Sequence, residues 1–198
     1  QEVIEFPLVL VDVRTRSPVG EFRTYVRPVH HPRLSAFCTR LTGIEQASVD
    51  EAPPWREALR MGQAWLEEQL EHHDFRSCAF VTCGDWDLKT MIGEQCQASG
   101  QHVPAQFRQW VNIKNVFKRL TGQAAGGMPS MLGALGLELL GRHHSGLDDC
   151  RNIARILRDL LARGPVVEGD VSHSQAAEGS RMGRGGRWSR RGRSEEGS

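Results

Sequence analysis

His144 and Asp149 lie five positions apart, where a polar loop gives way to an amphipathic segment. Hydrolysis of a phosphodiester needs a deprotonated water molecule, a base close to it and divalent cations on the phosphate oxygens. A histidine with a pKa near neutrality suits the base, and an aspartate supplies the oxygen ligand that Mg²⁺ or Mn²⁺ prefers. The pair alone is weak support for that chemistry. A histidine that forms hydrogen bonds within a loop, followed by Asp148 or Asp149 as the cap of a helix, would give the same pattern.

A second group of carboxylates lies between Cys83 and Leu88. Asp87 follows a short apolar run and begins a helical pattern, a position at which α/β sheets commonly bind ligands. Asp85 is the competing candidate, and its simplest role is a helix N-cap or turn, with Trp86 packed under the edge of the sheet. This segment alone leaves both interpretations open.

The elements that would position these residues are strands followed by alternating helices and strands. Residues 3–13 and 21–28 are rich in β-branched and aromatic residues, and the turn signal at residues 18–20 predicts a β-hairpin. Apolar residues at three- and four-residue steps predict helices, and short apolar runs predict further strands. The order predicts a mixed α/β sheet layered with helices. The predicted helices are residues 35–44, 55–70, 86–97, 130–140 and 148–163. Residues 78–82 are predicted as a strand, and residues 107–113 as a strand or the start of a helix.

Composition narrows the class of protein. The 198 residues are 39% hydrophobic and 25% charged, which is typical of a globular domain with a core. The formal net charge of +1 gives no general sign of nucleic-acid binding. The five cysteines are odd in number and lack a CxxC pair, so they favour free thiols and an intracellular location, in the cytoplasm or nucleus. No apolar run is long enough to span a bilayer.

The composition changes after Gly164. We assign residues 1–164 to one domain and residues 165–198 to a disordered tail rich in arginine and glycine. Between Arg181 and Arg193 the chain has six arginines, four glycines and no acidic residue. Such segments bind RNA through phosphate charge and stacking, and a solvated tail without a partner is an equally good interpretation.

Four segments in a fixed order resemble one family: residues 1–7, 37–44, 83–88 and 144–154. They are similar to the DEDDh exonucleases of the DnaQ-like superfamily, in the branch that trims histone mRNA and small RNAs. The resemblance covers roughly residues 1–164 and leaves the tail unmatched. It implies a ribonuclease H-like mixed sheet flanked by helices, and removal of nucleotides from RNA 3′ ends, with single-stranded DNA as the other substrate class.

The resemblance also implies roles in catalysis. His144 corresponds to the general base, and Asp87 and Asp149 correspond to ligands of two catalytic ions, Mg²⁺ or Mn²⁺. The family's first motif, an Asp-x-Glu on the first strand, would stand before Gln1, and Asp12 has no carboxylate two positions away to replace it. We therefore expect the first, central strand to be missing, two strand edges to be unpaired, and the chain alone to be inactive and poorly folded.

Four further residues are candidates for substrate binding. Leu41, Thr42 and Gly43 match the positions at which the family packs the terminal base and approaches its sugar, and we add Trp86. Ordinary termination of a helix at Gly43, with Leu41 in the core, is compatible with the same residues. The alternative function is a protein that binds nucleic acid without catalysis.

Overall fold

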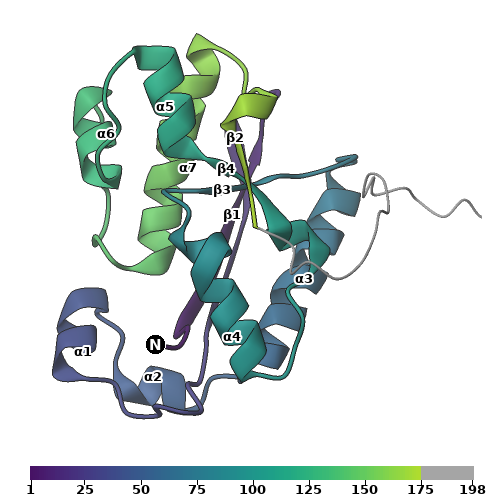
Figure 1. The fold of residues 1–198 in the computed structure, drawn as a ribbon, viewed down its shortest axis with the longest axis vertical. Coiled ribbons are helices and arrows are strands. Elements are labelled where there is room, and N and C mark those ends of the chain that lie inside the picture. Colours follow the sequence, from purple (N-terminus) through teal and green to yellow (C-terminus); the bar gives the residue numbers. More distant parts are fainter. Residues whose placement is uncertain (175–198) are drawn as a thin grey trace, which may run out of the picture.

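The computed structural model describes residues 1–174 and shows strands between two groups of helices (Figure 1). Strand β1 (Glu5–Asp12) pairs antiparallel with β2 (Ser17–Tyr25). Strand β3 (Phe80–Thr82) pairs parallel with β4 (Gln109–Asn112), which pairs antiparallel with β5 (Val171–His173). Within residues 1–174 these strands form a two-stranded and a three-stranded sheet, without backbone pairing between β1 and β3.

The turn of the predicted hairpin lies earlier than expected. Residues 18–20, predicted to form the turn, are part of β2, and the chain reverses directly after Asp12. Asp12 is only 8% exposed, and its carboxylate accepts a hydrogen bond from the Arg14 amide at 2.9 Å. Arg16 takes a left-handed φ of 58°, which closes the turn. The side chain of Asp12 therefore fixes the turn, which the Pro-Val-Gly pattern did not indicate.

The helices begin and end at capping signals in the sequence. The Ser35 hydroxyl accepts from the Cys38 amide at 3.1 Å, and Gly43 ends the same helix with a φ of 78°. The helix predicted at residues 130–140 stops at Ala134, because Gly136 turns the chain with a φ of 70°. No helix of residues 1–174 has the length and apolar content needed to cross a membrane. The helices are α1 (Ala36–Thr42), α2 (Gln46–Asp50), α3 (Trp55–His72), α4 (Ile92–Ala98), α5 (Ile113–Thr121), α6 (Met128–Ala134) and α7 (Gly146–Arg163), with a π-helical turn at Asp87–Met91 and 3₁₀ turns at Ala105–Arg108 and Glu168–Asp170.

Two hydrophobic cores lie on opposite faces of the strands. Trp110 of β4 packs with α3 and α4, whereas Val111, the next residue, packs with α5, α6 and α7. Phe80 and Val81 of β3 divide between the same two cores. Because successive side chains of a strand point to opposite faces, these pairs place the strands between two layers of helices (Figure 1). The predicted mixed α/β architecture is confirmed.

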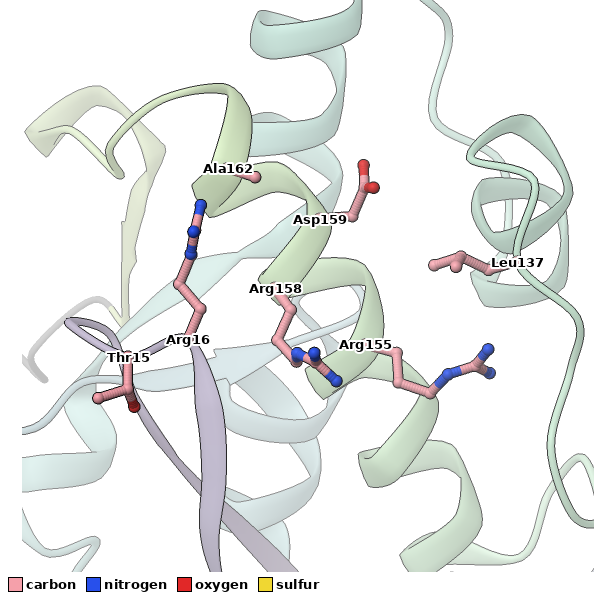
Figure 2. A pocket seen from close by; sticks show the side chains of 7 residues that line it. All are labelled: Thr15, Arg16, Leu137, Arg155, Arg158, Asp159 and Ala162. Carbon is pink, nitrogen blue, oxygen red and sulfur yellow. The ribbon is translucent and has the colours of Figure 1, made fainter.

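A cavity of about 1200 Å³ lies between β1 and β3. It is lined by β1, by residues 74–83 and by the inner face of α7, which includes Cys150, Ile153 and Leu157. Within residues 1–174, β1 and β3 each have one edge without a partner strand. This agrees with the expected pair of unpaired edges. Poor folding of the chain stays a prediction. Arg155 and Arg158 lie on the other side of α7, outside this cavity (Figure 2).

The ordered fold continues beyond the domain boundary expected at Gly164. Asp170 is 2% exposed and accepts two hydrogen bonds from the Arg119 guanidinium, at 2.7 and 3.0 Å. This ion pair joins α5 to the turn before β5, and β5 itself pairs with β4, so residues up to His173 pack against the rest of the fold. The arginine-rich segment at residues 181–193 lies outside the described residues.

Candidate active site

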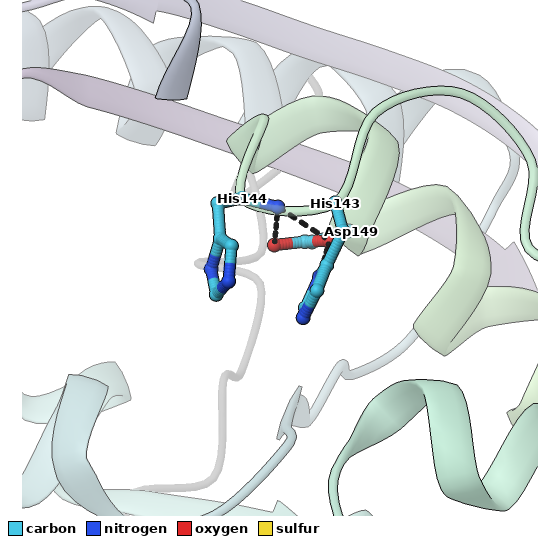
Figure 3. Close-up of side chains that lie close together, drawn as sticks. All are labelled: His143, His144 and Asp149. Atoms are coloured by element: carbon cyan, nitrogen blue, oxygen red, sulfur yellow. Dashed lines mark hydrogen bonds and ion pairs between the residues drawn. The ribbon is translucent and has the colours of Figure 1, made fainter. Parts of the chain in front are cut away.

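The N-terminal turn of α7 brings together His144 and Asp149, as the sequence predicted, with His143 beside them (Figure 3). The Asp149 carboxylate accepts a hydrogen bond from the His144 amide at 3.1 Å and lies 3.0 Å from Nδ1 of His143. His144 has a φ of 71°, and its ring stacks on that of His143 with the centroids 3.8 Å apart. Each of His143, His144 and Asp149 thus offers one atom that could bind a metal ion, and these three atoms lie within 4.8 Å of one another.

Asp148 and Asp149 have different roles. The Asp148 carboxylate accepts from the Arg142 amide at 3.0 Å, which lowers its pKa, and it pairs with Arg151 at 3.2 Å. Asp149 instead lines the cavity between β1 and β3. Asp148 thus stabilises the loop before α7, and Asp149 is the carboxylate that faces the cavity.

The structure also separates the two carboxylates that follow β3. Burial raises the pKa of Asp85, but hydrogen bonds from Trp110 Nε1 at 2.9 Å and Asn112 Nδ2 at 3.1 Å outweigh it and lower the pKa. Asp85 therefore fastens this loop to β4. Asp87 lines the cavity and has no ion-pair partner among residues 1–174. Trp86 is 58% exposed, so the expected packing under the sheet edge is wrong.

Negative charge accumulates at this end of the cavity. Asp87 is exposed as a residue, but the protein around its carboxyl partly desolvates that group and raises its pKa, and the charge of Asp149 raises it further. Burial, together with the charges of Asp149, Glu5 and Asp87, raises the pKa of the Cys150 thiol to about 12. A divalent cation would offset this repulsion, and carboxylate oxygens are the ligands that Mg²⁺ and Mn²⁺ prefer. Asp87 and Asp149 therefore fit a metal site.

Glu5 is a positioning residue that the sequence pattern did not single out. Its side chain is 6% exposed, and its carboxylate accepts from the Gly146 amide at 2.8 Å and pairs with Arg23 at 2.8 Å. A carboxylate at the N-terminus of a helix is favoured by the helix dipole. The only signal in the sequence is an acidic residue directly before the apolar run of residues 6–11.

Helix α1 places apolar side chains in solvent. Leu41 is 36% exposed, so its expected alternative place in the core is wrong, and Phe37, one turn earlier, is 66% exposed. The hydroxyl of Thr42 donates to the Cys38 carbonyl at 2.8 Å and accepts from the Ile44 amide at 3.1 Å. Thr42 thus forms the end of the helix. Phe37 was missed as a candidate for substrate binding, although its spacing of four residues from Leu41 indicates that the two share one face of the helix.

Arg142 joins α1 to the loop that precedes α7. Its guanidinium donates to the carbonyl of Arg40. A Cβ atom on Gly43 would lie 2.7 Å from Nη1 of Arg142, and Gly43 has a left-handed φ of 78°. Glycine is therefore needed there for both the turn and the close approach. The contact places the end of α1 next to the loop that contains His144.

Comparison with known proteins identifies the family. A family model described as Exonuclease (RNase T) matches residues 1–157. The chain belongs to the RNase T exonuclease family. It is 45% identical over 170 residues to ERI1 exoribonuclease 3 of Homo sapiens and of Bos taurus, which covers 85% of this chain and 50% of each relative. It is 34% identical over 176 residues to the 3′-5′ exonuclease Snipper of Drosophila melanogaster, covering 83% and 63%. This RNase T family chain thus spans about half the length of the curated relatives it matches first.

Solved structures share the fold. The nuclease domain of 3′hExo, described as a DEDDh family member bound to rAMP, has a TM-score of 0.76 and 34% identity, and the match covers 82% of both chains. A 3′-exonuclease that recognises the histone mRNA stem-loop has a TM-score of 0.76 and 30% identity, covering 88% of this chain and 81% of that one. The predicted DEDDh resemblance of this RNase T family chain is confirmed.

Proposed function

We propose that this chain is the nuclease domain of a metal-dependent 3′–5′ exonuclease that acts on RNA. The observation that carries the proposal is the meeting of His144 with Asp149, because Asp149 lines the same cavity as Asp87. In this proposal Asp87 and Asp149 bind the cations, Mg²⁺ or Mn²⁺, and His144 is the general base. When bound, such cations lower the pKa of a water molecule and neutralise phosphate charge.

His144 suits the transfer of a proton. Within residues 1–174 its ring nitrogens make no hydrogen bond, so they are free to accept a proton from water. Its backbone amide is held by Asp149, which keeps the base next to a proposed metal ligand. His143 contacts the same carboxylate, so a cation on Asp149 would lie beside the His143 ring.

Recognition of the 3′ end would use α1 and Trp86. Leu41, Phe37 and Trp86 are exposed apolar side chains on which a terminal base can stack. Gly43 lets the backbone approach a sugar, since it has no Cβ atom. The substrate class is supported by the relatives, which are named exoribonucleases, and by the rAMP bound to 3′hExo. Single-stranded DNA is the competing substrate.

We further propose that the metal site needs additional carboxylates from a strand in the cavity between β1 and β3. Two carboxylates are fewer than a two-metal site uses to bridge its ions. The unpaired edges of β1 and β3 would bind such a strand through backbone hydrogen bonds, and its far end would lie near Asp87 and Asp149. The family resemblance places an Asp-x-Glu pair on the strand next to β1.

The nuclease proposal is tested with the chain extended at its N-terminus by an Asp-x-Glu strand, on RNA labelled at its 5′ end, with Mg²⁺ or Mn²⁺. We expect products that shorten one nucleotide at a time from a free 3′ hydroxyl, no shortening of RNA that ends in a 3′ phosphate, and slower shortening of DNA. His144→Ala should lose this activity and still bind RNA. RNA that is bound but never shortened, in every form of the protein, would support the non-catalytic alternative instead.

The need for a further strand is tested by assaying the 198-residue chain beside a version extended at its N-terminus by an Asp-x-Glu strand. We expect activity in the extended version and little in the shorter one. The matched control is the extended version with Asn-x-Gln in place of Asp-x-Glu, which restores the strand without its charges. Equal activity of the shorter and extended versions would overturn the requirement.

A further inference from the structure

A second pocket lies on the side of α7 that faces away from the proposed active site (Figure 2). It has a volume of about 490 Å³, and its charged lining residues are Arg16, Arg155, Arg158 and Asp159. Arg16 comes from the turn between β1 and β2, and the other three come from α7. Positive charge from two elements that are distant in the sequence therefore gathers on one outward surface.

The charge of this surface is not compensated within the described chain. Asp159, its one acidic residue, is held by Arg163 at 2.8 Å. Arg155 donates only to neutral acceptors, the Glu138 carbonyl and Asn152 Oδ1. The side chains of Arg16 and Arg158 make neither a hydrogen bond nor an ion pair within residues 1–174. Three guanidiniums thus face solvent without a counter-charge, which favours an anionic ligand.

The arginines project from ordered elements. Arg155 and Arg158 are three positions apart on α7, so they are neighbours along one face of the helix. The turn that contains Arg16 is closed by Asp12, which accepts from the Thr15 hydroxyl at 3.2 Å. Because the backbone at both places is already fixed, a ligand has to immobilise only the side chains, which reduces the entropic cost of binding.

The position of the surface suits a polymer rather than the reacting nucleotide. Arg158 follows Asp149 by nine residues of α7, which corresponds to about 13 Å along the axis and a half-turn around it. Asp149 lines the cavity, and Arg158 lines the outward pocket. A mononucleotide at Asp149 cannot contact Arg158, whereas a longer strand can pass around the N-terminal half of α7.

We propose that Arg16, Arg155 and Arg158 form an exosite that binds backbone phosphates of the RNA strand several nucleotides from its 3′ end. Arginine suits this role because its planar fork of donors matches the oxygens of a phosphate. The ligand is the backbone, so the exosite is indifferent to base sequence. That the bound RNA is the substrate rests on the proposed nuclease function. The binding of backbone phosphates by the exosite does not depend on that function.

The test measures the binding of a fluorescent 20-nucleotide single-stranded RNA at several salt concentrations, without divalent cations. We compare the full chain with the Arg16→Gln/Arg158→Gln variant, which removes two charges that make no bond in the structure. The matched control is Arg56→Gln/Arg60→Gln, which removes two exposed arginines of α3. Loss of two phosphate contacts should flatten the slope of log K against log salt by about 1.4 and weaken binding at least several-fold.

The control should keep the slope and Kd of the unmodified chain, and free inorganic phosphate at millimolar concentration should not displace the RNA. An equal loss in both variants, an unchanged slope in the exosite variant, or displacement by free phosphate would overturn the exosite. The activity control gives all three proteins the N-terminal Asp-x-Glu strand and adds Mn²⁺. A p-nitrophenyl nucleotide ester is too short to reach the outward surface of α7, so the three extended proteins should hydrolyse it equally. If none of the extended proteins hydrolyses the ester or shortens RNA, the nuclease proposal fails, while the binding slopes still decide the exosite.

Discussion

Glu5 accepts a hydrogen bond at 2.8 Å from the amide of Gly146, although the two residues are 141 positions apart. The bond ties the first strand to the turn of α7 that contains Asp149. Because Gly146 is the first residue of α7, its amide has no acceptor within the helix. A Cβ atom on Gly146 would lie 2.8 Å from Glu5 Oε2, so only glycine permits this contact without displacement.

Glu5→Ala should lower the free energy of unfolding by about 2–4 kcal/mol, because it leaves the Gly146 amide and the Arg23 guanidinium without their buried partner. Glu5→Gln keeps a hydrogen-bond acceptor and should lose roughly half as much. Urea unfolding of the two variants measures both losses. Equal losses in the two variants would mean that the backbone hydrogen bond contributes nothing.

Gly43→Ala and Gly122→Ala separate backbone strain from crowding. Both glycines end helices at nearly the same left-handed φ, 78° and 71°, but a Cβ atom would meet Arg142 only at Gly43. Gly122→Ala should cost about 1–2 kcal/mol of stability through strain alone, and Gly43→Ala should cost more. Arg142→Ala should remove the excess at Gly43 in a double-mutant cycle. An excess that survives Arg142→Ala would contradict the contact.

Asp87→Asn should raise stability at neutral pH in the absence of divalent cations. The folded-state pKa of Asp87 is raised above its ordinary, unfolded-state value. The free energy of unfolding therefore falls as pH rises from the unfolded-state pKa through the folded-state pKa, because the folded protein has to ionise this carboxyl. Thermal unfolding in EDTA should show a higher midpoint for the variant, and added Mn²⁺ should stabilise only the unmodified chain. The same midpoint shift with Mn²⁺ in both proteins would remove Asp87 from the metal site.

Asp85 is the control for that prediction, because its pKa is lowered rather than raised. Its contribution is fully present above the unfolded-state pKa and is lost as pH falls through the folded-state value. Asp85→Ala should therefore lose about 1–3 kcal/mol at neutral pH, since Trp110 and Asn112 lose an acceptor. The response of this variant to Mn²⁺ should be unchanged.

The ion pair between Asp170 and Arg119 predicts where the domain ends. Asp170 has a lowered pKa, chiefly because Arg119 donates to it, so its contribution disappears in acid as pH falls below the ordinary value for aspartate. A chain of residues 1–164 should unfold at a lower urea concentration than a chain of residues 1–174. The difference should shrink as pH falls. Equal stability of the two chains would restore the boundary at Gly164.

Local signals in the sequence were sufficient for most elements of the fold. The spacing of apolar residues predicted α3 and α7, and Ser35 and Gly43 marked the ends of α1, because periodicity and capping act within a few residues. The hairpin turn was misplaced because its position depends on the buried side chain of Asp12 rather than on turn-forming residues.

The candidate site was only partly predictable for the same physical reason. His144 and Asp149 share one short segment, so their meeting followed from sequence distance. The contacts of Glu5 with Gly146 and of Arg142 with the end of α1 join residues that tertiary folding brings together, and no local pattern encodes them. Local pattern left Asp85 and Asp87 equivalent, and only the family resemblance favoured Asp87. The hydrogen bonds of Trp110 and Asn112 of β4 to Asp85 give a physical difference between the two.

The absence of a shared ladder between β1 and β3 within residues 1–174 has a kinetic consequence. The hairpin and the three-stranded sheet can open separately, because no backbone bond between strands obliges them to open together. Amide hydrogen exchange should therefore reveal two cooperative units of unequal lifetime. Helix α7 packs on both β1 and α5 and should exchange with the slower of the two. Because Glu5 belongs to the hairpin, opening of the hairpin breaks the hydrogen bond from Gly146 to Glu5. The opening rate of the hairpin therefore limits how long Glu5 can hold the first turn of α7 in place.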